Sequence, residues 1–385
     1  MGATRWLAVG QAGLSEPEPG ACAADRALVD SDAKLLVVFC SSEHDLPSVL
    51  RQINDRSGGV PLIGCSTAGE IAPSREASVV VTAFGGDGFS IATSVATDAT
   101  RDPRAAGAQA ASCLARIEDR PHRIVMLLTD GLTGDQQEIL RGVYGVLGAG
   151  VPLVGGCAGD DLKMTQTFQL HGDQVLTDSV VAAGIGSDAP LGIGVRHGWR
   201  KIGEPMLVTS SGGNHIRTLD GEPALDMYLE RLGASAPAHP SQEEVSRAAL
   251  VHPLGLIRRD GEEQVRYISG ADVVERSLSC MAEIPQGAHV WIMEGDEASV
   301  LGATDAACTD SLLPLDGCRP LGMLAFDCVS RRSVLGDHGI KVEIDRILES
   351  AAGAPVAGLY TYGEIARTRG IGGFHNQTIV VLSVA

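Results

Sequence analysis

The sequence predicts an α/β protein of repeated strand–helix–strand–loop–strand units, which form mixed sheets covered by helices in two domains. Three observations predict this fold class. A twelve-residue motif occurs three times, each copy follows an apolar strand and an amphipathic helix, and another strand comes after each copy. A helix that connects two strands is typical of parallel pairing with a right-handed crossover.

The motif reads VPLIGCSTAGEI at 60–71, VPLVGGCAGDDL at 151–162 and APVAGLYTYGEI at 354–365. All three copies have proline at the second place, glycine at the fifth and an acid at the eleventh. Glycine lets backbone elements approach closely at the end of a strand. We therefore expect each copy to be a tight junction between a strand and a loop.

The flanking segments justify the other elements of each unit. Strand and helix pairs are expected before the three copies, at 34–42 and 46–57, 123–131 and 135–148, and 321–331 and 339–353. Strands are expected after them, at 77–86, 179–187 and 376–385. Asp135 is a residue type that caps helix N-termini. Ile340, Ile344 and Ile347 have the helical spacing of one apolar face.

The pattern changes near residue 220. TLDGEPALDMYLERLG predicts a helix capped by Asp220, and ASAPAHPSQEE after it reads as a connector. A strand that runs into a long helix is expected within 289–312. We place a domain boundary here, with one domain over 1–222 and the other over 223–385.

Composition excludes several classes of protein. Of the 385 residues 44% are hydrophobic and 20% are charged, which is typical of a globular chain. The net charge of −18 argues against nucleic acid and anionic membrane surfaces as partners. Apolar runs are strand-sized, and no export signal is recognisable at the start, so the cytoplasm is expected. Nine cysteines without a CxxC pair indicate reduced thiols.

The first motif contains a group that could act as a nucleophile. Cys65 lies beside Ser66 and Thr67, and Cys157 lies in the second copy. A reactive thiolate needs a nearby base or positive field, and no His or Lys lies within several residues of Cys65. Small buried residues at a strand end are therefore favoured, and an enzyme with Cys65 or Cys157 as nucleophile stays an alternative.

The acids of the motif have two interpretations. Glu70, Asp161 and Glu364 occupy the eleventh place, and Asp160 precedes the second of them. They can accept hydrogen bonds from loop amides and anchor the loops. Ligand crevices of α/β folds lie outside the carboxyl ends of parallel strands, so these acids are also candidates to contact a ligand.

The C-terminal stretch combines polar and aromatic groups. Tyr360, Tyr362, Glu364, His375 and Asn376 lie close together in a chain with 4% aromatic residues. This is the composition of a ligand pocket. The alternative is a hairpin whose His and Asn side chains bond the turn backbone.

Four ordered motifs carry a resemblance to a known family. GCSTAGEI, VGGCAGDD, HGW followed by LDGEPALDMY, and YTYGEI followed by HNQT resemble the FIST family, from about Lys34 to Thr378. The resemblance implies a non-enzymatic sensory module, with a FIST N domain over 1–222 and a FIST C domain over 223–385, that binds a small ligand. Stand-alone chains of this size resemble NosP-type haem-binding nitric-oxide sensors. These act on a sensor histidine kinase or a cyclic-di-GMP enzyme.

Haem b, as the resemblance implies it, would need an axial ligand, most simply a neutral imidazole. His197 follows an apolar strand and His375 lies in the C-terminal loop, so these two are our candidates. There is no CxxCH motif for covalent attachment. A haem-free sensor of amino-acid-like molecules, held by the acids of the motif, is the alternative. The sequence leaves the ligand, the partner and a homo-oligomeric state open.

Overall fold

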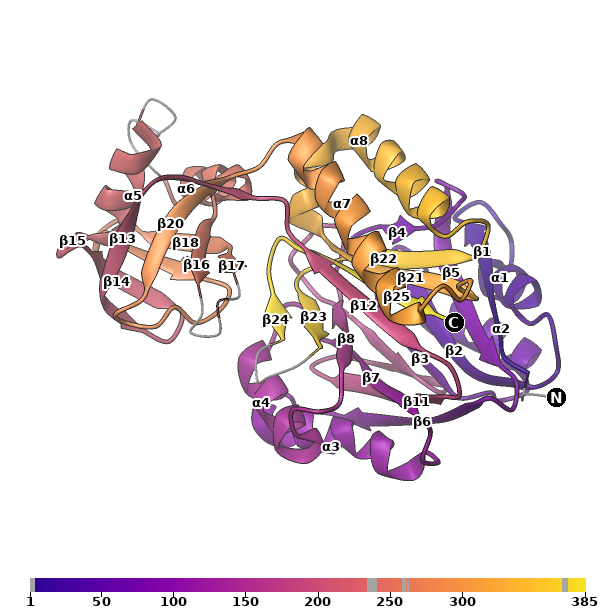
Figure 1. Cartoon of the computed structure of the whole chain (residues 1–385). Helices are drawn as coiled ribbons and strands as arrows, with labels where there is room; N and C mark the ends of the chain where they lie inside the picture. The colour runs from indigo at the N-terminus through magenta and orange to yellow at the C-terminus, as the bar shows by residue number, and fades with distance from the viewer. Residues whose placement is uncertain (1–3, 234–240, 258–260, 262, 369–372) are drawn as a thin grey trace.

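A computed structural model describes residues 4–233, 241–257, 261, 263–368 and 373–385. Figure 1 shows a large body, which contains both termini, and a smaller lobe beside it. Within the described residues no helix has the length and apolar character needed to cross a membrane.

The body is built from the three predicted units, and this confirms the α/β fold class. In each unit two strands pair in parallel around a helix, and a third strand pairs antiparallel to the first. The first unit is β2 (Ala33–Cys40), α2 (Leu46–Ser57), β3 (Leu62–Ser66) and β5 (Ala77–Gly85). The second is β7 (His122–Thr129), α4 (Gln136–Leu147), β8 (Leu153–Cys157) and β11 (Val180–Ser187). The third is β21 (Gly322–Cys328), α8 (Val329–Ser350), β22 (Val356–Thr361) and β25 (Ile379–Val384).

The units exchange their loops in a cycle. Each unit contributes a short strand to the sheet of another unit, which begins at the end of the motif in the first and third units and after it in the second. β4 (Glu70–Ile71) pairs with β22, β9 (Gln169–His171) pairs with β3, and β23 (Glu364–Arg367) pairs with β8. Hairpin partners β10 (Gln174–Leu176) and β24 (Phe374–His375) follow β9 and β23. Edge strands β1 (Trp6–Gly13), β6 (Phe89–Ala96) and β12 (Leu191–Arg196) complete the three sheets.

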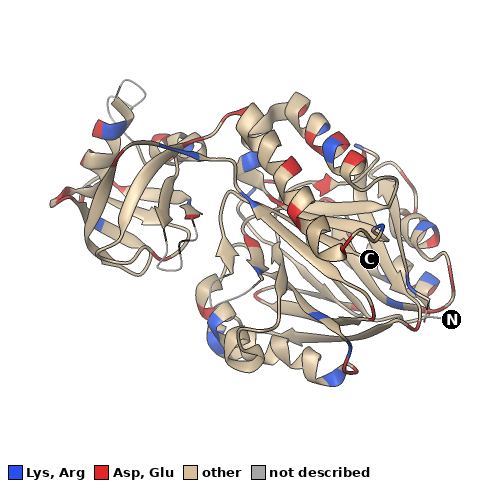
Figure 2. Ribbon diagram, in the orientation of Figure 1, with Lys and Arg blue, Asp and Glu red and all other residues tan. Residues whose placement is uncertain are grey.

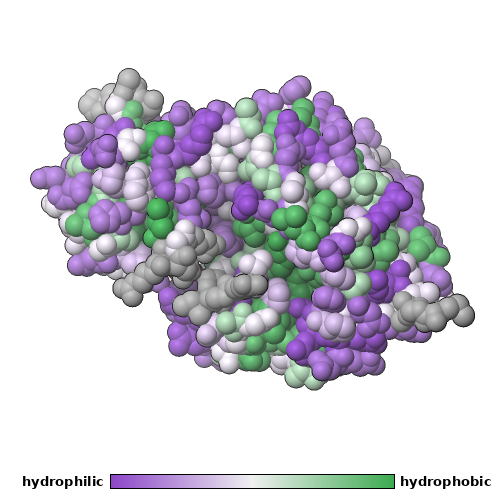
Figure 3. All heavy atoms as spheres, in the orientation of Figure 1, coloured by the Kyte–Doolittle hydropathy of each residue, from purple (hydrophilic) through white to green (hydrophobic). Residues whose placement is uncertain are grey.

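One apolar core lies between the inner faces of the three sheets. It joins residues of β2, β7 and β21, and the Phe39 and Phe326 rings meet edge to face with centroids 5.9 Å apart. Helices cover the outer faces. These are α1 (Pro19–Ala27) with α2, α3 (Pro103–Ala111) with α4, and α7 (Glu297–Leu312) with α8. In Figure 3 hydrophobic residues show mainly in the middle of the body, near α7 and β12, and hydrophilic residues cover its periphery.

The glycine at the fifth place of the motif has the predicted role. A Cβ atom on Gly64, Gly155 or Gly358 would lie 2.4, 1.9 or 2.2 Å from the carbonyl oxygen of the paired residue on the neighbouring strand. These distances are far inside van der Waals contact. Only glycine therefore allows the two parallel strands of each unit to approach as they do.

The lobe is an insertion between β12 and α7. Its sheet contains β13 (Arg200–Gly212), β14 (His215–Leu219), β15 (Glu222–Pro223), β16 (Leu254–Ile257), β17 (Glu263–Arg266), β18 (Ile268–Asp272), β19 (Ser277–Cys280) and β20 (His289–Glu294). Two helices, α5 (Ala224–Leu232) and α6 (Gln242–Val251), pack on it in a separate core. The division predicted at residue 222 falls in β15, inside this lobe.

Local predictions in the helices had mixed outcomes. The carboxylate of Asp135 caps α4 by accepting the backbone N–H groups of Gln137 and Glu138, as expected. Asp220 does not cap α5, because the N-cap is Pro223 and the Asp220 carboxylate accepts the N–H of Leu207 instead. The strand and long helix expected in 289–312 are β20 and α7.

Candidate functional site

The three motif copies meet at one junction. Their seventh residues are Ser66, Cys157 and Tyr360, and each accepts a backbone hydrogen bond from the ninth residue of another copy. The pairs are Gly159 N to Ser66 O at 3.0 Å, Tyr362 N to Cys157 O at 3.2 Å, and Ala68 N to Tyr360 O at 2.9 Å. Because these bonds satisfy buried backbone groups, the motif is first of all a structural connector.

The thiols at the junction lie in apolar surroundings. Cys65 and Cys157 are buried, and burial raises the pKa of both, that of Cys157 to about 12. Cys157 also accepts the Thr129 hydroxyl at 3.1 Å. Thiols that stay protonated near pH 7 are poor nucleophiles. The geometry therefore gives no support to a cysteine enzyme.

The hydroxyl groups beside Cys65 form hydrogen bonds within the loops. Ser66 Oγ donates to the Gly159 carbonyl at 2.8 Å and accepts the Phe168 N–H at 2.9 Å. Thr67 donates to Glu70 Oε1 at 2.7 Å. Burial raises the pKa of Glu70 to about 7, with the charge of Asp161 acting in the same direction.

The two adjacent acids of the second copy differ in their roles. Asp160 is buried and accepts three loop N–H groups, those of residues 164–166, together with the Tyr362 hydroxyl. Burial opposes its ionisation, but these hydrogen bonds outweigh burial and lower its pKa. Asp161 is partly exposed and lies 3.8 Å from the Arg332 guanidinium. Asp160 is therefore a loop anchor.

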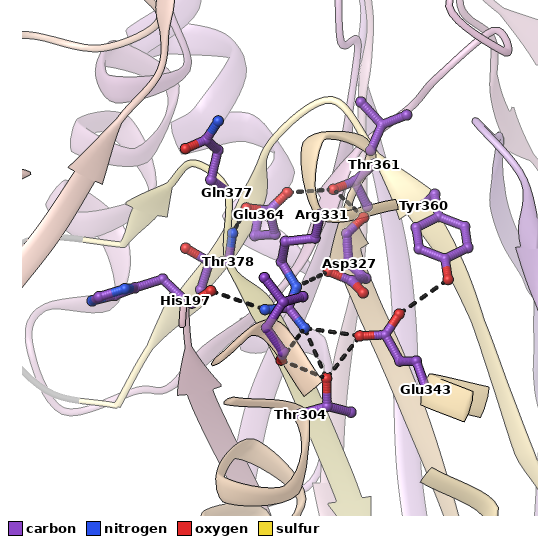
Figure 4. A network of polar contacts seen from close by, with 12 residues as sticks. His197, Thr304, Asp327, Arg331, Glu343, Tyr360, Thr361, Glu364, Gln377 and Thr378 are labelled. Atoms are coloured by element: carbon purple, nitrogen blue, oxygen red, sulfur yellow. Dashed lines mark hydrogen bonds and ion pairs between the residues drawn. The ribbon is translucent and has the colours of Figure 1, made fainter. Parts of the chain in front are cut away.

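Behind the third copy lies a buried ionic network, shown in Figure 4. The Arg331 guanidinium contacts Asp327 at 2.6 Å and Glu343 at 2.8 Å, and all three side chains have no exposed surface. Arg331 also donates to the carbonyl of His197 at 2.9 Å. Tyr360 donates to the second oxygen of Glu343 at 3.1 Å.

Glu364 lies beside this network (Figure 4). One carboxyl oxygen accepts the Thr361 hydroxyl at 2.6 Å and the other accepts the Thr378 N–H at 3.1 Å. Burial raises its pKa to about 8. Sequence reasoning found Glu364 and Tyr360 but missed Asp327, Arg331 and Glu343. Asp327 and Arg331 could have been predicted, because an acid at the end of an apolar strand is followed four residues later by an arginine.

Two adjoining cavities lie between the body and the lobe. The smaller, of about 660 Å³, is lined by β12, β17 and the β23–β24 hairpin, and by Asp310 of α7. The larger, of about 880 Å³, is lined by α4 and Phe374 of the body and by β16, β17 and β20 of the lobe. Gln264 and Gly373 line both, so we treat them as one interlobe cleft.

The cleft contains two of the predicted residues, and the others lie elsewhere. His197 and His375 both line the smaller cavity. Asn376 follows His375 and donates to its carbonyl at 3.1 Å. The remaining predicted residues line neither cavity: Cys65, Ser66, Thr67, Glu70, Cys157, Asp160, Asp161, Tyr360, Tyr362 and Glu364.

The two imidazoles do not fit axial ligation of haem through Nε2 as they lie. The Trp199 N–H donates to Nδ1 of His197 at 3.0 Å, so the ring proton is on Nε2, which faces Glu263 at 3.6 Å. Burial lowers the pKa of His197 to about 4. Nε2 of His375 must donate, because its partner is the Ala366 carbonyl at 2.9 Å. Within the described residues no group of three His, Cys, Asp or Glu could hold a metal ion.

Comparison with family models identifies the family of this chain. The FIST N domain matches residues 34–222 and the FIST C domain matches residues 224–367. The chain belongs to the FIST family. FIST domains are sensory domains that bind small ligands.

Individual relatives of this FIST protein are distant. An uncharacterized protein of Mycobacterium tuberculosis (strain ATCC 25618 / H37Rv) is 27% identical over 270 residues, which cover 68% of each chain. One of Methanocaldococcus jannaschii is 24% identical over 68% of this chain and 54% of its own. Among solved structures, cyanuric acid hydrolase from A. caulinodans has a TM-score of 0.38 at 10% identity, over 99% of this chain and 100% of its own. That score is too low to carry an argument.

Proposed function

We propose that this protein is a non-enzymatic sensor whose small ligand binds in the interlobe cleft and changes the position of the lobe. The observation that supports this most is the way the lobe is attached. Both connections, one from β12 to β13 and one from β20 to α7, lie side by side (Figure 1). Arg200 and Glu294, the first and last residues of the lobe, pair across them. Two adjacent connecting segments can act together as a hinge.

Polar contacts join the body and the lobe. The Arg141 guanidinium of α4 lies 2.8 Å from the Glu283 carboxylate of the lobe. The side-chain oxygen of Gln137 accepts the Glu283 N–H at 2.9 Å. Contacts of this kind can break and re-form as the lobe turns. A ligand shifts such an equilibrium only if it binds one arrangement more tightly, and a cleft with walls from both parts meets that condition.

Gln377 connects the body, the hinge and the lobe. Its side-chain amide donates to the carbonyls of Ala249 and Leu250 at the end of α6, at 3.3 and 3.2 Å. Its own carbonyl accepts the Trp199 indole N–H at 2.9 Å. Its φ of 56° is unusual for a residue with a side chain, and such strain is common at switch positions.

The signal would be read by another protein. By the resemblance, this partner is a histidine kinase or a cyclic-di-GMP enzyme in the cytoplasm. The resemblance suggests a more specific version of this proposal, in which the protein binds haem and senses nitric oxide. It requires His197 or His375 to give up the hydrogen bond described above, so we derive no step through haem. The absorption spectrum of the purified protein with added haem tests it, because ligation by a histidine produces a Soret band that the H197A or H375A variant lacks.

The hinge can be tested by measuring the distance between body and lobe. Spin labels on exposed positions of α3 and α5, in a chain whose exposed Cys318 is replaced by serine, report this distance by pulsed electron resonance. We expect a bound ligand to narrow or shift the distance distribution. A ligand that binds in the cleft and leaves the distribution unchanged would contradict the proposal.

A further inference from the structure

Two short sequence motifs that are far apart in the chain meet at the base of the lobe. HGW occupies residues 197–199, where the chain leaves the body, and HNQT occupies residues 375–378 in a loop of the body. They are joined by the bond from the Trp199 indole N–H to the Gln377 carbonyl at 2.9 Å. Both side chains are buried. The start of the hinge is therefore bound directly to the body loop.

Trp199 contacts both connections between the body and the lobe. It is the last residue of the first connection before β13, and Gly295 follows β20 in the second. A Cβ atom on Gly295 would lie 2.2 Å from the Trp199 ring, so the ring packs closely against this backbone. Trp199 also shares a small core with Val265 and Met293 of the lobe. A turn of the lobe about its two connections therefore changes the contacts of Trp199.

The HNQT loop is held in the body on its other side. The Thr378 N–H donates to the Glu364 carboxyl at 3.1 Å, and the Thr378 carbonyl accepts the Cys328 N–H at 3.1 Å. Glu364 and Cys328 are buried residues of the third unit. The loop is therefore part of the body, and it can serve as a fixed point for the lobe.

The side chain of Gln377 reaches from this loop to the lobe. Its amide nitrogen lies 3.3 Å from the Ala249 carbonyl and 3.2 Å from the Leu250 carbonyl. Because α6 ends at Val251, these are carbonyls that the end of a helix leaves without a partner inside the helix. Gln377 thus caps a lobe helix from the body.

The contact between Gln377 and α6 is close to balance. Both hydrogen bonds are longer than the usual 2.9–3.0 Å. Among the described residues no donor reaches the buried side-chain oxygen of Gln377, and its φ of 56° is strained. These two costs offset part of what the two bonds contribute. Such a contact can hold one arrangement of the lobe while a second stays accessible, as a two-state element requires.

We propose that Gln377 and Trp199 form a latch, which holds the lobe in the described arrangement and whose release lets the lobe turn. This inference rests on the proposed function and names the contact that regulates its cleft. Charged residues are spread over both body and lobe (Figure 2), but the two latch residues are uncharged and buried. Salt therefore screens the latch far less than it screens exposed ion pairs.

Two variants of Gln377 test the latch. Gln377→Met keeps the length of the side chain without the amide, and Gln377→Gly removes the side chain and relaxes the backbone. The spin labels on α3 and α5 report the distance in the full chain without an added ligand. We expect the ratio of molecules outside the main distance peak to those inside it to rise about fivefold in both variants, the effect of one ordinary hydrogen bond. A rise in Gln377→Gly alone would show that the amide is not the latch.

Two further variants separate the parts of the latch. Ala352→Gly changes another residue of positive φ in the body, and we expect no change of the distance distribution there. Trp199→Phe keeps a ring against Gly295 and removes the indole N–H, so we expect a smaller rise of about twofold. An unchanged distribution in Trp199→Phe would remove Trp199 from the latch. Loss of stability in the Gln377 variants without a change of distance would show that the contact only supports packing.

Arg141→Ala separates the latch from the movable lobe. This variant removes the ion pair with Glu283, which joins body and lobe outside the latch. A broader distribution in Arg141→Ala but in neither Gln377 variant would refute the latch and leave the movable lobe of the proposed function standing. An unchanged distribution in all three variants would refute both.

Discussion

Arg331 is a buried cation whose guanidinium contacts two carboxylates and the hinge backbone. Asp327 and Glu343 flank it without exposed surface, and the His197 carbonyl accepts its third contact. Taking such charges out of water is costly, and each depends on the others for compensation. The residue therefore links the stability of the third unit to the position of the hinge.

Replacing Arg331 by methionine should destabilise the protein strongly. The change leaves Asp327 and Glu343 buried without their cation, and we expect a loss of about 3–5 kcal/mol in the free energy of unfolding. Chemical denaturation measures it. Arg346→Met on the same helix is the control, because its partner Asp305 is half-exposed and the expected loss is below about 1 kcal/mol. Similar losses in both variants would contradict the role of Arg331.

Glu364 should make stability fall as pH rises. Its folded pKa of about 8 is above the value of an unfolded glutamate, so the folded state holds the proton more tightly. The stabilisation is complete below about pH 4 and is lost as pH rises toward 8. Glu364→Gln keeps an uncharged side chain at all pH values, and we expect it to remove on the order of 2 kcal/mol of this loss.

Denaturation at pH 5 and pH 8.5 tests the Glu364 prediction. The pH-dependent difference in unfolding free energy should shrink in Glu364→Gln and stay unchanged in Glu349→Gln, an exposed position near the end of α8. An unchanged slope in the Glu364 variant would show that this carboxyl does not titrate with folding.

At the scale of elements, the decisive feature is the close approach of paired strands at the fifth residue of each motif. A Cβ atom on Gly155 would lie 1.9 Å from the Leu127 carbonyl oxygen, and its φ of 144° adds backbone strain. The two strands cannot separate locally, because both are buried between the central core and α4.

Gly155→Ala should therefore destabilise the second unit by about 3 kcal/mol or more. Gly145→Ala in α4 is the matched control, since nothing lies within 4 Å of its added methyl group. Alanine is a better helix former than glycine, and we expect the control to gain up to about 1 kcal/mol. Thermal unfolding of both variants would decide, and a tolerated alanine at 155 would contradict the close-approach argument.

The sequence predicted elements well where a pattern was repeated. Three copies of strand, helix and strand could be aligned, and local signals such as Asp135 placed a helix start correctly. The lobe was not predicted as a unit, because its short strands carry no repeat. Asp220 was wrongly predicted as a helix cap. An aspartate side chain can accept a hydrogen bond either from the first turn of a helix or from the end of a strand, and here the tertiary position of Leu207 determines which of the two forms.

The candidate site was predicted less well for a related reason. The motif residues are prominent in the sequence because they join the units, whereas the cleft is made by segments without a motif. His197 and His375 were found through residue type, but Trp291 and Tyr144 lie in an ordinary strand and helix. That both line one cavity depends on how the lobe lies against α4, which no local pattern encodes.

At the scale of the whole molecule, we expect residues 1–222 alone not to fold. The isolated segment lacks β23 beside β8, and it lacks β21, β22 and β25, the three strands of the third sheet that close the central core. Circular dichroism and amide chemical shifts of this fragment should show loss of fixed tertiary structure. A cooperative unfolding transition in the fragment would contradict the expectation.

The complementary deletion should be tolerated. Arg200 and Glu294 pair across the base of the lobe, so a short glycine linker can replace residues 200–294 and connect β12 to α7. We expect this shortened chain to unfold cooperatively without binding the cleft ligand. Failure of the shortened chain to fold would show that the body depends on the lobe.

The exchange of loops between units also sets an order of events during translation. A ribosome releases β8 long before residues 364–367, which form its neighbour β23. It releases β21 before β25, which lies between β21 and β12. The nascent chain therefore carries unpaired strand edges through most of its synthesis, and these are surfaces that chaperones protect. β25, which completes the third sheet, emerges after all the other strands described here.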